Sequence, residues 1–330
     1  MSTVAATAPP IVLRFGIAGC GWVARDFVAP ALAEATRATA VACFDPDPLA
    51  RLPGLRAHAS LRALVTDPHV DAIYVATPNH AHADVVEAAA AAGKHVLCEK
   101  PMAATLAQAE RIAAACRRAG VVYATAFDQR FHPAHVALRA LVAAGELGTV
   151  TAARIVYACW LGPDWADDNW RADPSRAGGG ALLDLAPHGL DLLQTLLGSP
   201  LEDLVALKQR RVHPYPVDDG AALAARFEDG TLATLHVAYN HPETLPRRRL
   251  ELVGTEGLAV ATDTMGQTPG GSLRIHPAGT SQTPRDVPFA AGSPFTAQLD
   301  AFAAAVLDGR APFGGADHDL KLMAKLEPWR

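Results

Sequence analysis

Basic runs and paired cysteines are scarce in this sequence. The net charge is -5, and the tightest basic cluster is the trio Arg247, Arg248 and Arg249, so the chain lacks the basic block of a nucleic-acid-binding protein. Because an apolar run over 250–253 follows the trio, we interpret it as the solvated edge of a sheet. The five cysteines include no CxxC pair, which favours reduced thiols and a cytoplasmic location.

Signals for export, membranes, metals and serine hydrolysis are also missing. The first ten residues hold no basic segment, and no uninterrupted apolar run approaches the roughly 18 residues of a membrane span. The segment NHAH at 79–82 offers two histidines without a third metal ligand, and no GxSxG motif occurs. We therefore expect no membrane partner, no metal site and no serine nucleophile.

Strands and helices alternate in the first third of the chain, which predicts an α/β domain with a doubly wound parallel sheet over 1–127. The expected strands are 11–19, 38–45, 70–77, 95–100 and 121–127. The expected helices are 22–35, 61–68, 81–92 and 106–119.

Two hairpin patterns indicate a second domain of the α+β class over 128–330. One pair of alternating runs turns at Asp229-Gly230, and another turns within 254–257, which favours an antiparallel sheet. We expect helices near 133–144, 295–307 and 317–326, the last of them packed back on the first domain. Residues 264–294 are expected to form an irregular loop with one short strand at 273–275.

A glycine pattern follows the first strand and opens the first helix. Gly19, Gly21 and Ala24 form GxGxxA, with Trp22 inside it. The first glycine allows the turn, the second lets backbone approach a pyrophosphate, and the small third residue permits close packing. A tight turn alone would need glycine too, but the flanking strand and helix favour a dinucleotide site.

Asp45 ends the second expected strand. A carboxylate there can accept hydrogen bonds from ribose hydroxyls and repels a 2'-phosphate, which favours NAD and leaves NADP open. The alternative is an Asx turn within DPDP, residues 45–48.

Charged residues follow the fourth expected strand, at the sheet end where ligands of open parallel sheets bind. Glu99, Lys100 and Pro101 interrupt an apolar run there, and an ammonium group at such a position is a candidate catalytic group. Thr77, Asn79 and His82 follow the neighbouring strand and are candidate cofactor contacts. Asn79 could equally cap the helix 81–92.

Asp184, His188 and Asp191 share one face if residues 181–197 are helical, because their spacings are four and three. Pro187 complicates this helix, since proline removes one backbone hydrogen bond and clashes with the preceding turn. Either the first turn is kinked, or the regular helix begins close to Pro187.

Together these motifs resemble the glucose-fructose oxidoreductase, inositol dehydrogenase and MocA family (Gfo/Idh/MocA). The resemblance rests on GxGxxA, on TPNHAH at 77–82, on EKP at 99–101 and on GGGALLDLAPHGLD at 178–191. It implies a Rossmann domain followed by an α+β domain with a large open, mainly antiparallel sheet. It also implies a homodimer or homotetramer and a cis peptide between Lys100 and Pro101.

The resemblance implies catalytic roles for three residues. Lys100 corresponds to a lysine at the substrate carbinol, and Asp184 and His188 to the catalytic pair of the second domain. An imidazole, whose ordinary pKa is about 6.5, can take the hydroxyl proton while the lysine stabilises alkoxide charge. Asp184 would orient His188 or bind the hydroxyl, and Asp191 would support the helix.

A tryptophan-rich segment precedes the glycines and offers substrate contacts. Trp165 and Trp170 can stack on sugar or cyclitol rings, and Arg171 can bond hydroxyls. Packing in a subunit interface is the equal alternative. Arg130 matches the family's N-x-R-F segment, although Asp128 stands where asparagine is usual.

We therefore expect an NAD(P)-dependent dehydrogenase of a sugar, cyclitol or related polyol. Two alternatives remain: an NAD-dependent glycosidase of the same fold, and a nucleotide-binding sensor without turnover. Intact Lys100, Asp184 and His188 argue against the sensor.

Replacing Asp45 tests the cofactor preference. We expect Asp45→Ala or Asp45→Ser to relax the preference for NAD toward NADP, because the 2'-phosphate no longer meets a carboxylate. The measurement is kcat/KM with each cofactor, and an unchanged NAD to NADP ratio contradicts the assignment.

Overall fold

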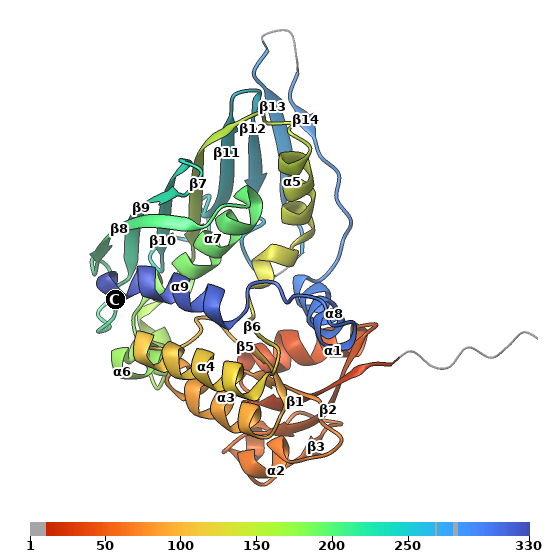
Figure 1. Cartoon of the computed structure of the whole chain (residues 1–330). Helices are drawn as coiled ribbons and strands as arrows, with labels where there is room; N and C mark the ends of the chain where they lie inside the picture. The colour runs from red at the N-terminus through yellow and green to blue at the C-terminus, as the bar shows by residue number, and fades with distance from the viewer. Residues whose placement is uncertain (1–10, 268, 280–282) are drawn as a thin grey trace, which may run out of the picture.

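The computed structural model of the chain describes residues 11–267, 269–279 and 283–330. Two sheets build two halves, which Figure 1 shows one below the other. Helices α8 (Pro294–Leu307) and α9 (Ala316–Leu326) lie where the halves meet (Figure 1). Among these residues no helix is both long and apolar enough to cross a membrane.

The first sheet is parallel and doubly wound, as expected. Its order is β3-β2-β1-β4-β5-β6, so the chain starts near the middle and winds outward in both directions. The strands are β1 (Leu13–Ala18), β2 (Ala38–Phe44), β3 (Arg56–Ala57), β4 (Ala72–Val75), β5 (His95–Cys98) and β6 (Tyr123–Thr125). All of β4 is buried, because helices cover both faces.

Helices from distant parts of the sequence cover this sheet. One face carries α2 (Leu61–Val65), α3 (His82–Ala91) and α4 (Leu106–Ala119). The other carries α1 (Ala29–Glu34) together with α8, whose Phe302 ring lies 5.8 Å from that of Phe15 on β1. The C-terminal part of the chain therefore completes the core of the first half.

The first expected helix, 22–35, is divided in the structure. A π-helical turn, η1 (Ala24–Val28), precedes α1. Pro30 explains the change in winding, because it lacks the N–H that would donate to Asp26 one α-helical turn earlier.

The second sheet is mainly antiparallel, as expected, with the order β14-β13-β12-β11-β7-β10-β9-β8. Among the described strands of this sheet, only β7 and β10 run parallel to each other. The strands are β7 (Val150–Ala158), β8 (Leu201–Gln209), β9 (Gly220–Phe227), β10 (Leu232–Ala238), β11 (Arg248–Gly254), β12 (Gly257–Thr262), β13 (Ser272–Pro277) and β14 (Arg285–Asp286). The hairpins β9–β10 and β11–β12 confirm the two predicted turns.

One expectation about this sheet is wrong. β11 pairs with both β7 and β12, so the arginine trio at its start does not mark a sheet edge. The reason is that β7, about a hundred residues earlier in the chain, enters between the two hairpins. The residues of β11 therefore give no local sequence signal that the strand pairs with β7.

Helices α5 (Pro133–Ala143) and α7 (Ala181–Leu197) pack on the second sheet. α7 begins at Ala181, so the alternative start near Pro187 is wrong. The carboxylate of Asp218 accepts hydrogen bonds from the backbone N–H groups of Gly180 and Leu182, at 2.9 and 2.8 Å, and so satisfies the helix start.

The remaining helical segments are short. They are α6 (Pro174–Ala177), η2 (Pro48–Ala50), η3 (Asn79–Ala81), η4 (Asp128–Phe131), η5 (Pro163–Ala166), η6 (Trp170–Ala172) and η7 (Glu327–Trp329). The last long helix, α9, contacts α4 and β6 of the first half, and α7 and β8 of the second. It therefore joins the halves.

Candidate active site

Residues of both halves line one cavity of about 560 Å³. Gly21, Thr77 and Lys100 come from the carboxyl ends of the first sheet, and Asp184 and His188 come from α7. The fold thus brings together the three catalytic candidates and several of the cofactor candidates, which lie far apart in the sequence.

Lys100 and Asp184 form an ion pair across the two halves. The Lys100 Nζ donates to Asp184 Oδ1 at 2.5 Å and to the Asp184 carbonyl at 3.0 Å, and Tyr239 OH donates to Asp184 Oδ2 at 2.8 Å. Burial by itself would raise the pKa of Asp184. The charges of Lys100 and Arg171 and these hydrogen bonds outweigh it and lower the pKa well below its usual range. Asp184 is therefore a carboxylate that positions Lys100.

His188 lies beside Asp128 rather than within the Lys100–Asp184 contacts. Its Nδ1 is 3.3 Å from Asp128 Oδ1, without forming a hydrogen bond in this geometry. The ring meets those of Tyr157 and Phe127 edge-on, at centroid distances of 5.7 and 6.2 Å. Asp128, which departs from the family's usual asparagine, thus places a carboxylate beside the expected proton acceptor.

Glu99 and Lys100 follow β5. The peptide bond between Lys100 and Pro101 is cis, as expected. Glu99 lines the cavity and accepts a hydrogen bond from Tyr74 OH at 2.7 Å. Burial raises the pKa of Glu99, although the Tyr74 hydrogen bond and the Lys100 charge oppose it.

The glycine turn after β1 has the geometry of a dinucleotide site. Gly19 has φ +90°, and a Cβ there would lie 2.7 Å from the backbone of Ala76. Gly21 has no other atom near its missing Cβ and lines the cavity, as does the exposed Trp22. Ala24 is fully buried, so its small side chain allows the close packing that the motif implied.

Asp45 stabilises the same turn. Its Oδ2 accepts from Cys20 N at 2.7 Å, and its Oδ1 accepts from Asp47 N at 2.9 Å. The Asx turn considered for DPDP is therefore present, while the role of Asp45 toward a ribose stays a prediction.

The three candidates after β4 occupy different positions. Thr77 lines the cavity, and its buried Oγ1 has no hydrogen-bond partner among the described residues. Asn79 also lines the cavity, and its amide donates to the carbonyl of Ala177 at 2.8 Å. It does not cap α3, which has no side-chain cap.

His82 does not line the cavity but joins two loops that do. Its Nε2 lies 2.9 Å from the Thr77 carbonyl, and its Nδ1 lies 3.1 Å from the Pro101 carbonyl. Burial lowers the pKa of His82 to about 4, against the raising effect of these carbonyls. It is therefore a neutral ring between the Thr77 and Lys100 loops.

The tryptophan-rich segment forms one wall of the cavity. Trp165, Trp170 and Arg171 line it, and the Arg171 guanidinium lies 4.4 Å from the Trp170 ring centroid. Arg130 does not line it. Its buried guanidinium forms a two-pronged ion pair with Asp191, so both residues connect η4 to α7.

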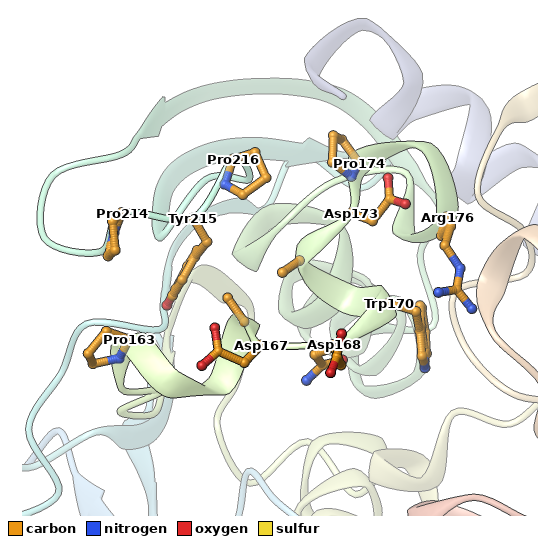
Figure 2. A pocket seen from close by; sticks show the side chains of 13 residues that line it. Pro163, Asp167, Asp168, Trp170, Asp173, Pro174, Arg176, Pro214, Tyr215 and Pro216 are labelled. Atoms are coloured by element: carbon orange, nitrogen blue, oxygen red, sulfur yellow. The ribbon is translucent and has the colours of Figure 1, made fainter.

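Next to the tryptophan-rich segment is a second hollow of about 570 Å³, whose lining residues Figure 2 shows. Trp170 and Asn169 border both cavities. Figure 2 shows Asp167, Asp168 and Tyr215 around the second hollow, which no lysine or histidine lines. Of these two cavities, the first is therefore the one that a lysine and a histidine line.

One cluster among the described residues has metal-ligand spacing: Asp191, His318 and Asp319 offer ligand atoms within 4.8 Å of one another. Asp191 is already paired with Arg130, and none of the three lines the catalytic cavity. We assign no metal role to this cluster.

Comparisons with known proteins agree with this geometry. Residues 13–127 match the oxidoreductase family with an NAD-binding Rossmann fold, and residues 135–260 match the GFO/IDH/MocA C-terminal domain. The chain belongs to the Gfo/Idh/MocA oxidoreductase family. It is accordingly an NAD-binding oxidoreductase, and its relatives include sugar dehydrogenases and reductases that act on CH–OH groups.

Three relatives illustrate the similarity. The chain is 36% identical to 1,5-anhydro-D-fructose reductase of Ensifer adhaerens over 83% of each protein. It is 30% identical to D-xylose 1-dehydrogenase (NADP(+)) 2 of Haloferax volcanii, over 96% of this chain and 95% of that protein. The crystal structure of aldose-aldose oxidoreductase from Caulobacter crescentus, complexed with glycerol, has a TM-score of 0.85 at 28% identity, covering 96% of each chain.

The cavity of this Gfo/Idh/MocA protein fits a nicotinamide dinucleotide. The open backbone at Gly21 can approach a pyrophosphate, and Thr77, whose buried hydroxyl has no partner among the described residues, lines the same cavity. Gly21, Trp22, Thr77, Asn79 and Glu99 are the residues in position to hold the cofactor.

Tyr239, Tyr157 and Arg248 also line the cavity, and sequence reasoning did not find them. Each lies at an end of a strand in the second sheet or just beyond one. Because the order of that sheet depends on long-range pairing, the sequence carries no signal that these strand ends meet α7. The polar residue at each strand end is the only available hint.

The pH dependence of stability tests the buried, neutral state of His82. The unfolded chain binds a proton at His82 below about pH 6.5, and the folded chain does so only near pH 4. Lowering the pH through this window therefore destabilises the fold, by up to about 1.4 kcal/mol per pH unit from this residue. We expect His82→Gln to flatten the curve of unfolding free energy against pH.

Urea unfolding at several pH values measures this effect. His69→Gln, at an exposed position, is the control and should leave the slope unchanged. An equally steep slope in His82→Gln would show that His82 already carries its proton in the fold.

Proposed function

We propose that this protein transfers a hydride between a secondary hydroxyl of a sugar, cyclitol or related polyol and NAD. The observation that supports this most strongly is the meeting of Lys100, Asp184 and His188 in one cavity with Gly21 and Thr77. An ammonium donor and a proton acceptor beside a dinucleotide site are what alcohol oxidation requires.

NAD, when bound, supplies the hydride acceptor, or as NADH the donor. During oxidation the C–H hydrogen leaves the carbinol carbon as hydride, and His188 takes the hydroxyl proton. Lys100 stabilises the alkoxide charge that develops on the substrate oxygen, since its Nζ is held in the cavity by Asp184. Asp184 acts through Lys100 and Tyr239, and we assign it a positioning role.

Asp128 has a part in the proton step. Its carboxylate lies 3.3 Å from His188 Nδ1, where it stabilises the imidazolium that forms when the ring accepts the proton. The remaining walls hold the substrate: the rings of Trp165 and Trp170 can lie against the apolar face of a sugar ring.

NADH formation with a panel of inositols, aldoses and sugar acids tests this function. We expect Lys100→Met and His188→Ala each to lower kcat by about 100-fold or more, because each removes a group that acts in the transition state. Lys208→Met, at an exposed position on β8, is the matched control and should retain full activity.

Other outcomes separate the alternatives. Full activity of His188→Ala contradicts the proton-transfer role. Cleavage of a glycoside without net NADH formation favours the glycosidase, and NAD binding without any turnover favours the sensor.

We propose further that the chain forms a homodimer or homotetramer through the outer face of the second sheet. Val205 and Leu207 on β8 and Leu232 on β10 are 55%, 75% and 58% exposed, which leaves large apolar side chains in contact with water. Sedimentation should show a dimer or tetramer that Leu207→Lys weakens. A monomer at micromolar concentration contradicts this assembly.

A further inference from the structure

Arg248 is a cavity residue without a protein partner for its charge. It is the first residue of β11 and lines the catalytic cavity, and its Nε is buried and forms no hydrogen bond within the described residues. No carboxylate of those residues lies within 4.0 Å of its guanidinium. The segments outside the described ranges contain no Asp or Glu that could supply one.

The two neighbouring arginines differ from Arg248 in this respect. Arg247 pairs with Glu243 at 2.9 Å, and Arg249 pairs with Glu251 at 2.7 Å. Successive strand residues face opposite sides of a sheet, so Arg249 points away from the cavity that Arg248 lines. The arginine that lacks a carboxylate is therefore the one that faces the site.

The fold leaves space for the Arg248 guanidinium. A Cβ added to Gly266 would lie 2.3 Å from Arg248 Nη1, so the guanidinium packs directly over this glycine. Gln129 Nε2 donates to the Gly266 carbonyl at 2.9 Å and holds the turn in place. The Arg248 side chain is thus supported in its position at the cavity wall.

The other charges of the cavity are largely accounted for within the protein. Lys100 is paired with Asp184, and Asp128 lies beside His188. Arg171 is a second guanidinium with no carboxylate within 4.0 Å among the described residues, and it lies over the Trp170 ring. Two guanidinium groups from the second half therefore line the cavity without an ion pair of their own, although the charge of Arg171 also acts on Asp184.

We propose that Arg248, together with Arg171, binds an anionic group of the substrate. The enzyme would then act on a sugar or polyol that carries a carboxylate or a phosphate, which refines the substrate class and rests on the proposed function. A guanidinium matches both anions with two parallel hydrogen bonds. Withdrawing an unpaired charge from water costs free energy, and an anionic substrate would offset that cost on binding.

The cofactor pyrophosphate is a less suitable partner for Arg248. The glycine turn at Gly19 to Gly21 lies on the first half, whereas β11 belongs to the second sheet, beside Tyr157 and His188. If Arg248 served the cofactor, its replacement would raise the KM for NAD for every substrate.

Matched substrates test the proposal: D-glucose, D-gluconate, D-glucuronate and D-glucose 6-phosphate, each with saturating NAD. We expect kcat/KM to be higher for the two carboxylates or for the phosphate than for glucose. The substrate group with the higher kcat/KM identifies whether the site binds a carboxylate or a phosphate. Arg248→Gln should lower the ratio of anionic to neutral kcat/KM by about 10- to 100-fold, the effect of losing a charged hydrogen-bonding partner.

Two further variants keep the test independent of folding. Gly266→Ala retains the charge but displaces the guanidinium, and it should lower the same ratio. Arg249→Gln removes a charge from the same strand on the opposite face and should leave the ratio unchanged.

Calorimetric binding of gluconate and glucose 6-phosphate to the NAD-loaded protein measures affinity even without turnover, and Arg248→Gln should weaken it.

Defined results overturn the proposal. A wild-type preference for glucose, an equal loss for anionic and neutral substrates, or a raised KM for NAD would each show that Arg248 does not bind a substrate anion. Turnover of glucose in preference to its anionic forms would refute this inference but would leave the proposed function in place. Absence of NADH with these four compounds and with the whole panel of inositols, aldoses and sugar acids would refute the proposed function, and the calorimetric comparison would still decide the inference.

Discussion

The ion pair between Lys100 and Asp184 is the interaction on which the site depends. Its two members come from the end of β5 and from the first turns of α7, 84 positions apart in the sequence and in different halves. Burial opposes the charged form of Asp184, whereas contact with Lys100, the charge of Arg171 and the Tyr239 hydrogen bond favour it and lower the pKa. The relative position of the two halves and the charge state of the site therefore depend on each other.

Several contacts besides this ion pair stabilise the loops and helices around the cavity. Asn79 donates to the carbonyl of Ala177, just before the glycines that lead into α7. His82 lies between the Thr77 and Pro101 carbonyls, so that one buried ring joins the two loops of the first half. On the opposite face of the first sheet, α8 returns from the C-terminal part of the chain and completes the core. Contacts between protein groups thus connect the elements around the cavity to one another.

Much of the site could be predicted from local sequence. Gly19, Lys100, Asp184 and His188 stand in motifs whose spacing reflects one turn, one strand end and one helix face, and the structure places them accordingly. What local sequence could not predict was how these motifs pair. Asp184 contacts Lys100 rather than His188, and Asp128 lies beside His188, because those contacts depend on how α7 packs against η4 and meets the loop after β5.

The sequence by itself determined the alternation of strands and helices, the glycine turn, the strand-end lysine and the two hairpins. Each of these features depends on the residues of one short, continuous segment. Only the tertiary structure decided that β7 separates the hairpins, that α8 covers the first sheet, and that Arg248 faces the cavity between two arginines that have acidic partners. The physical reason is that burial and charge pairing are properties of surfaces brought together from distant segments. The local sequence pattern indicates which face of a helix or strand a residue occupies, but not which residues it contacts in the folded protein.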